Sequence, residues 1–190
     1  RPQPEPSPPS LPAVRPHGPR DHLSRLLAEH ELFGAIAPDL RQRLLDGASR
    51  RFCRSGVPIV RAGEPGSSMF VVVEGLLSVA VPDTDGSDVR GDDMAPGSIF
   101  GEFSLLTGEP RSATVVPFVD SVVYEIGKAD LQPILEQSPE LAHELSRILA
   151  ARQARTRDLL SRHSPDTVPA AEHSQHRILD RLRVFFGLDE

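Results

Sequence analysis

The sequence has 190 residues, which suits one domain with extensions or two small domains. Its formal net charge of −6 argues against non-specific nucleic-acid binding by the chain as a whole. The only cysteine, Cys53, excludes an internal disulfide framework and a multi-cysteine zinc site. No apolar run approaches the roughly 18 residues that a membrane-spanning helix needs.

Proline dominates the start of the chain, so residues 1–20 are expected to form a Pro-rich disordered linker. Helical spacing of apolar residues then predicts a helix over residues 21–33, and Pro38 suits the first turn of a second short helix. Between residues 50 and 126 the apolar stretches become short, rich in valine and separated by glycine turns. This pattern predicts an antiparallel, jelly-roll-like β-roll.

Helical spacing returns after Gly127. A serine, a proline and a glutamate at 138–140 form a helix start, and they predict a long helix over about residues 139–162. Residues 163–190 are expected to form a linker and a short amphipathic helix. The expected fold is therefore α+β, with one domain over residues 21–162 in which N-terminal helices and a C-terminal helix flank the roll.

One connection between two strands is much longer than a hairpin needs, and it runs over residues 97–114. Its centre favours one helical turn whose first backbone amides are unpaired, and Gly101 lets an anion approach the backbone closely. Arg111 adds a planar guanidinium that suits a phosphate. Glu102 is an acceptor among donors, which fits a ligand with hydroxyl groups beside its phosphate. These residues indicate a phosphorylated sugar.

The residues of this connection resemble a known motif. Phe100-Gly101-Glu102-Phe103-Ser104-Leu105-Leu106, followed by Pro110-Arg111-Ser112-Ala113-Thr114, is similar to the phosphate-binding cassette of cyclic nucleotide-binding domains. That family includes catabolite activator proteins, protein kinase A regulatory subunits and cyclic-nucleotide-gated channels. Upstream, the runs 63–66 and 69–75 are similar to the strand–turn pattern of the family. The resemblance covers about residues 21–160.

The resemblance implies a role for each matching residue. Arg111 would pair with the cyclic phosphate, and Glu102 would accept a hydrogen bond from the ribose 2′-hydroxyl beside the Gly101 backbone. Ser112 and Ala113 would offer a hydroxyl and an amide to phosphate oxygens. The further contacts implied by position come from Phe103, Ser104, Val71, Ile99, Leu105 and Val115.

The resemblance also makes the helix from Pro139 a lid over the base, with Arg155 and Thr156 as candidate contacts beside Arg152 and Arg157. Many cGMP-selective channels carry threonine where this chain has Ser112, so serine favours cAMP over cGMP. The roll contains no histidine, which argues against a metal-dependent β-barrel enzyme, and no catalytic constellation is visible. We therefore expect a non-catalytic ligand-binding domain without a metal or other cofactor.

The two ends of the chain bear on the attached effector. The 28 residues from His163 onward are too few for a winged-helix domain and are not notably basic, so no nucleic-acid partner is expected. The first residue is Arg1, and we expect a piece of a longer, oligomeric protein. The layout resembles cytoplasmic sensors behind bacterial inner-membrane channels of the mechanosensitive or cyclic-nucleotide-gated type. The alternatives are the ligand-binding part of a catabolite-activator-like regulator and a non-binding assembly module.

Overall fold

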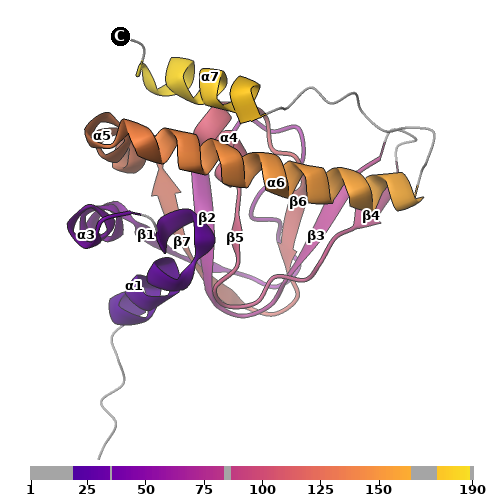
Figure 1. Cartoon of the computed structure of the whole chain (residues 1–190). Coiled ribbons are helices and arrows are strands. Elements are labelled where there is room, and N and C mark those ends of the chain that lie inside the picture. The colour runs from indigo at the N-terminus through magenta and orange to yellow at the C-terminus, as the bar shows by residue number, and fades with distance from the viewer. Residues whose placement is uncertain (1–18, 35, 84–86, 164–174, 189–190) are drawn as a thin grey trace, which may run out of the picture.

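The computed structural model describes residues 19–34, 36–83, 87–163 and 175–188 (Figure 1). The expected linkers over residues 1–20 and after residue 163 fall largely outside these ranges. The strands are β1 (Ser49–Cys53), β2 (Ser68–Glu74), β3 (Leu77–Pro82), β4 (Asp88–Arg90), β5 (Ile99–Phe100), β6 (Thr114–Pro117) and β7 (Ser121–Gly127). The helices are α1 (Pro19–Glu29), α2 (Glu31–Gly34), α3 (Pro38–Gly47), α4 (Glu102–Thr107), α5 (Lys128–Gln137), α6 (Pro139–His163) and α7 (Gln175–Phe186).

The strands form two antiparallel sheets that face each other. One sheet has the order β1-β7-β2-β5, and the other has the order β4-β3-β6. Strand β2 lies between β7 and β5 and is covered on both faces, which explains its unbroken apolar run. Phe70 and Val72 point into the roll, whereas Met69, Val71 and Val73 point toward the helices. The predicted α+β roll is confirmed.

Helices cover the outer face of the four-stranded sheet and enclose a second core. The predicted helix over residues 21–33 is interrupted, because the chain turns at His30 between α1 and α2. There the His30 imidazole accepts a hydrogen bond from the Leu32 amide at 3.1 Å and satisfies the start of α2. Among the described residues, no helix is long and apolar enough to cross a membrane.

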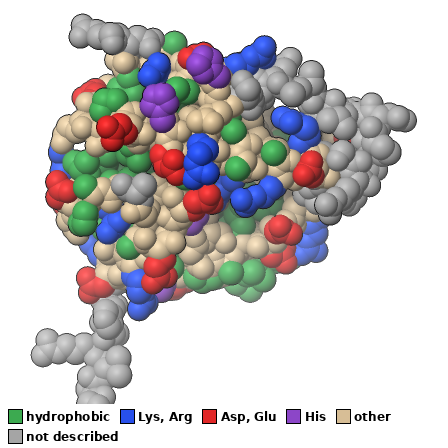
Figure 2. Space-filling view, in the orientation of Figure 1, with side chains coloured by type: hydrophobic (Ala, Val, Ile, Leu, Met, Phe, Trp, Pro, Cys, Tyr) green, Lys and Arg blue, Asp and Glu red, His purple; other side chains and the backbone are tan. Residues whose placement is uncertain are grey.

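Helix α6 runs across the front of the roll, and α7 lies beside it (Figure 1). Charges of both signs gather on the face of the molecule where α6 crosses the front (Figure 2). On α6, Glu144 and Arg147 form an ion pair. The predicted start at residue 139 agrees with the first residue of α6. Helix α7 packs its apolar face on this same domain, against α6 and α4.

Candidate ligand-binding site

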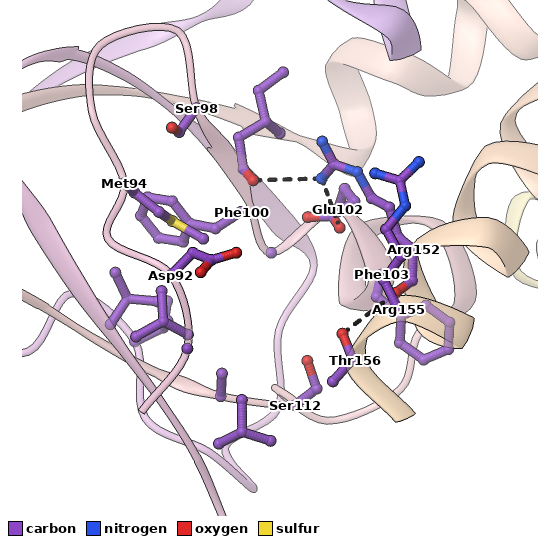
Figure 3. A pocket seen from close by; sticks show the side chains of 18 of the residues that line it. Asp92, Met94, Ser98, Phe100, Glu102, Phe103, Ser112, Arg152, Arg155 and Thr156 are labelled. Atoms are coloured by element: carbon purple, nitrogen blue, oxygen red, sulfur yellow. Dashed lines mark hydrogen bonds and ion pairs between the residues drawn. The ribbon is translucent and has the colours of Figure 1, made fainter. Parts of the chain in front are cut away.

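A cavity of about 1050 Å³ lies between the roll and α6. This volume suits a small organic ligand of nucleotide size. The cavity is lined by the cassette around α4, by the segment that precedes β5, and by the middle of α6 (Figure 3). Twelve of the predicted binding residues line it: Ile99, Gly101, Glu102, Phe103, Ser104, Arg111, Ser112, Ala113, Val115, Arg152, Arg155 and Thr156.

Two predicted apolar wall residues are elsewhere, and the structure corrects their positions. Val71 lies on the helix-facing side of β2, because side chains alternate along a strand and its neighbours Phe70 and Val72 already point into the roll. Leu105 lies on the buried face of α4 and belongs to the same helix-side core. Both side chains therefore support the sheet–helix interface. Arg157, which was named beside the candidate contacts of α6, does not line the cavity.

Arg111 is fixed by backbone contacts on both sides of the site. Its amide donates to the Glu64 carbonyl at 2.8 Å, and its own carbonyl accepts from the Gly63 amide at 2.8 Å. The guanidinium donates to the Ser68 carbonyl at 2.5 Å, to the Ser68 hydroxyl at 3.1 Å and to the Gly101 carbonyl at 3.2 Å. The first residue of β2 and the residue that precedes α4 therefore hold the side chain, and the loop before β2 holds the backbone of the same arginine.

Two glycines make room for this guanidinium. A methyl group on Gly66 would lie 2.2 Å from Arg111 Nε, and one on Gly101 would lie 2.6 Å from Arg111 Nη1. Arg111 is only 8% exposed. Burial lowers the pKa of its guanidinium, while the carboxylates of Glu125, Glu102 and Glu64 act in the opposite direction. The close approach of Gly66 to Arg111 was not foreseen, because the two positions are far apart in sequence.

Glu102, the first residue of α4, contacts α6 directly. Its Oε1 accepts from Arg152 Nη1 at 3.0 Å, and Arg152 also reaches the Ile99 carbonyl at 3.4 Å (Figure 3). Arg152 Nη2 lies 3.2 Å from His30 Nε2. Burial and the charge of Arg152 lower the pKa of His30 to about 4, and Glu31 opposes this shift. The neutral imidazole is therefore favoured beside the arginine.

The opposite wall of the cavity was missed by sequence reasoning. Asp92, Met94 and Phe100 lie there, across open space from Arg155 and Thr156 on α6 (Figure 3). Asp92 follows β4 in a segment whose alternation is too short to indicate which residues face inward. The cavity thus combines a buried cation, hydroxyl and amide groups, apolar walls and several carboxylates, among them Glu102 and Asp92. This set suits a ligand that carries a phosphate, hydroxyls and an aromatic ring.

A family model described as "cyclic nucleotide-binding domain" matches residues 50–138, which include the entire cassette and the roll. The chain belongs to the cyclic nucleotide-binding domain family. The matched segment lies within residues 21–160, over which the sequence resemblance extends. The prediction of the family is therefore confirmed.

Relatives of different kinds share this domain. A cyclic nucleotide-gated potassium channel of Mesorhizobium japonicum is 37% identical over 62% of this chain and 31% of the channel. The solved catabolite activator protein of Thermus thermophilus has 30% identity and a TM-score of 0.59, over 68% of this chain and 61% of that protein.

A further solved structure, the N-terminal domain of a Streptomyces coelicolor transcriptional regulator, has 30% identity and a TM-score of 0.57. It is matched over 70% of this chain and 93% of its own length. By contrast, this chain spans about a third of the length of the curated potassium channels that it matches.

Proposed function

We propose that this domain binds a cyclic nucleotide, with cAMP favoured over cGMP, and regulates an attached effector without catalysing a reaction. The observation that carries the proposal is the environment of Arg111. It is buried in the wall of a cavity of sufficient size, and its hydrogen bonds go to the uncharged oxygens of Ser68 and Gly101. Within the described ranges it forms no ion pair with a carboxylate.

A buried charge is costly unless an opposite charge accompanies it. The singly charged cyclic phosphate of a nucleotide supplies that charge at the place where the guanidinium meets the cavity. Ser112 and Ala113, which follow Arg111 in the cavity wall, provide a hydroxyl and an amide for the phosphate oxygens. Ser104 and the Gly101 backbone border the same region.

Glu102 is suited to the ribose. Glu102 lines the cavity, and its carboxylate already accepts a hydrogen bond from Arg152. A second lone pair remains for the 2′-hydroxyl, since an ionised carboxylate accepts several hydrogen bonds. Ligand binding would then join the ribose, the cassette and the lid helix through one carboxylate.

The base would lie between the walls formed by Ile99 and Phe103 and the polar groups of α6. Arg155 and Thr156 line the cavity on α6 and are our candidates for contacts to the purine. Ser112 is the residue that favours cAMP, and the Thermus thermophilus relative is named a cyclic AMP receptor protein. Asp92, on the facing wall, is a further acceptor for amino groups of a base.

The effector that we favour is a bacterial ion channel, with this domain on its cytoplasmic side and assembled as an oligomer. Channels of Mesorhizobium japonicum and Rhizobium etli are among the curated relatives and support this choice. The alternative is the sensor part of a transcription regulator, which the likeness to the Streptomyces coelicolor regulator domain supports. In either case, the nucleotide shifts the effector only by its difference in affinity for two states of the domain.

Isothermal titration calorimetry with cAMP and then with cGMP tests the binding proposal. We expect saturable binding, tighter for cAMP, and a loss of about 10- to 100-fold or more in Arg111→Ala, because a charged hydrogen bond contributes about 1.5–3 kcal/mol. The matched control is Arg51→Ala. Arg51 Cζ lies 5.6 Å from the Phe70 ring centre, as Arg111 Cζ does, but Arg51 is exposed, pairs with Glu125 and does not line the cavity.

Two results would overturn the assignment. Equal affinity of wild type and Arg111→Ala would remove Arg111 from the phosphate site. Absence of binding of either nucleotide to the wild-type chain would favour the non-binding assembly module. Weaker nucleotide binding by the control variant Arg51→Ala would indicate that the loss of an arginine near Phe70 acts through the fold and not through a contact with the ligand.

A further inference from the structure

Helix α7 joins two parts of the molecule that both border the nucleotide cavity. It packs along α6, which carries Arg152, Arg155 and Thr156, and against α4, the helix of the cassette (Figure 1). Its inward face is apolar and buried, and comprises Ile178, Leu179, Leu182 and Phe186. The helix is thus a built part of this domain, although none of its residues lines the cavity.

The contact with the cassette is close at the end of α4. Gly108 ends that helix with a φ of +73°, and a methyl group there would lie 2.6 Å from Cδ2 of the Phe185 ring. The ring therefore packs directly on the cassette backbone. The next residue, Glu109, forms an ion pair with Arg181 on α7. Both contacts lie two to three residues before Arg111 in the chain.

Lys128, the only lysine of the chain, forms a second anchor. Its Nζ donates to the Phe185 carbonyl at 2.5 Å and lies 4.0 Å from the centre of the Phe185 ring. An ammonium group at this point satisfies a carbonyl at the C-terminal end of α7 and interacts with the ring face. Lys128 is the first residue of α5, at the junction between the sheet and the helices.

The contact with the lid helix completes the arrangement. The buried side chains of α7 pack on α6, and Arg183 Nη2 lies 3.3 Å from His143 Nε2 near the start of α6. Helix α7 therefore touches α6, the junction at Lys128 and the end of α4 at once. Movement of α6 away from the cassette would break the apolar contacts on one side of α7 or the polar contacts on the other.

We propose that α7 is a clasp that holds the lid helix α6 against the phosphate-binding cassette, so that nucleotide binding and α7 docking stabilise each other. The proposal rests on the proposed function, and it concerns the regulation of the same site. When α7 is docked, α6 and the cassette already have the spacing that lines the cavity, and less ordering accompanies binding. Reciprocity requires that the nucleotide strengthens α7 docking by the same factor.

The test compares two substitutions on α7 that add the same charge. Leu182→Asp places a carboxylate in the buried face and is expected to undock the helix, whereas Val184→Asp lies at a side chain that is 72% exposed. We expect Leu182→Asp to bind cAMP about 5- to 150-fold more weakly than wild type, the usual range for coupled sites. Val184→Asp should bind like wild type. Lys128→Met, which removes one anchor and leaves the apolar contacts in place, should show a smaller loss.

Hydrogen exchange of residues 175–188 in the wild-type chain provides the reciprocal measurement. Saturating cAMP should slow exchange there by a factor similar to the affinity lost in Leu182→Asp. If wild type binds cAMP but Leu182→Asp and Lys128→Met bind equally well, and α7 exchange does not change, the clasp is overturned while the proposed function stands. If wild type binds neither cAMP nor cGMP, the proposed function fails and the coupling fails with it.

Discussion

The two ends of α4 use the same backbone device for different purposes. Gly101 at its start has a φ of +78°, and Gly108 at its end has a φ of +73°. Each glycine has a side chain from elsewhere packed where a Cβ would lie, Arg111 at one end and Phe185 at the other. The first end presents a cation to a cavity, and the second presents bare backbone to an apolar ring. One short helix therefore connects the proposed ligand site to a packing site.

The largest expected effect is the loss of cAMP affinity in Gly101→Ala, at the start of α4. The new methyl group would meet Arg111 Nη1 at 2.6 Å and the Ser68 carbonyl at 3.0 Å, in a conformation that costs an alanine about 1–2 kcal/mol. We expect cAMP affinity to fall about 10- to 100-fold, the equivalent of a lost charged hydrogen bond. Titration calorimetry measures the cAMP affinity of the variant, and an affinity within twofold of wild type would contradict the proposed position of the phosphate.

Gly108→Ala, at the end of α4, should disturb the contact with Phe185 and mainly lower the free energy of unfolding. Its methyl group would overlap Phe185, and overpacking of this kind costs about 1–3 kcal/mol in the free energy of unfolding. Urea unfolding monitors this change. The matched control is Gly56→Ala, because Gly56 has a φ of +75° with nothing within 4 Å of the added methyl group. Equal destabilisation of the two variants would show that the Phe185 contact contributes nothing.

A smaller effect, on the pH dependence of the free energy of unfolding, is expected only at the start of α4. His30 contacts Arg152 beside Glu102 at the ligand end, and its pKa is lowered from 6.5 to about 4 in the folded chain. Between these values the unfolded chain binds the proton and the folded chain does not, so the free energy of unfolding should fall as the pH decreases from about 6.5 to 4.

His30→Gln should flatten that pH dependence, as measured by urea unfolding at several pH values. The control, His176→Gln, changes an exposed histidine on α7 and should keep the wild-type slope. If His30→Gln keeps the slope as well, burial and the charge of Arg152 do not hold His30 in its neutral form.

The sequence was sufficient for features that depend on local signals. The helical turn expected near Gly101 is α4, and Pro139 marks the start of α6 as expected, because glycine readily adopts a positive φ and proline fixes φ irrespective of the remaining fold. The cassette residues around Arg111 were predicted by resemblance, since their spacing is short and characteristic.

Features that depend on distant contacts were not predicted. Val71 was assigned to the wrong face of β2, because a strand buried on both faces shows no alternation from which its inward side can be read. The approach of Gly66 to Arg111 and the position of Asp92 across from α6 arise only when the two sheets close. The same holds for Lys128, whose partner Phe185 is 57 residues away.

Lys128 has a chemical consequence of its own. It is the only lysine in the sequence, so the chain carries one side-chain primary amine, and the end of α7 covers it. An amine-selective reagent therefore has a single side-chain target whose reactivity depends on whether α7 is in place. The protein carries its own reporter group at the point where α7 meets the first residue of α5.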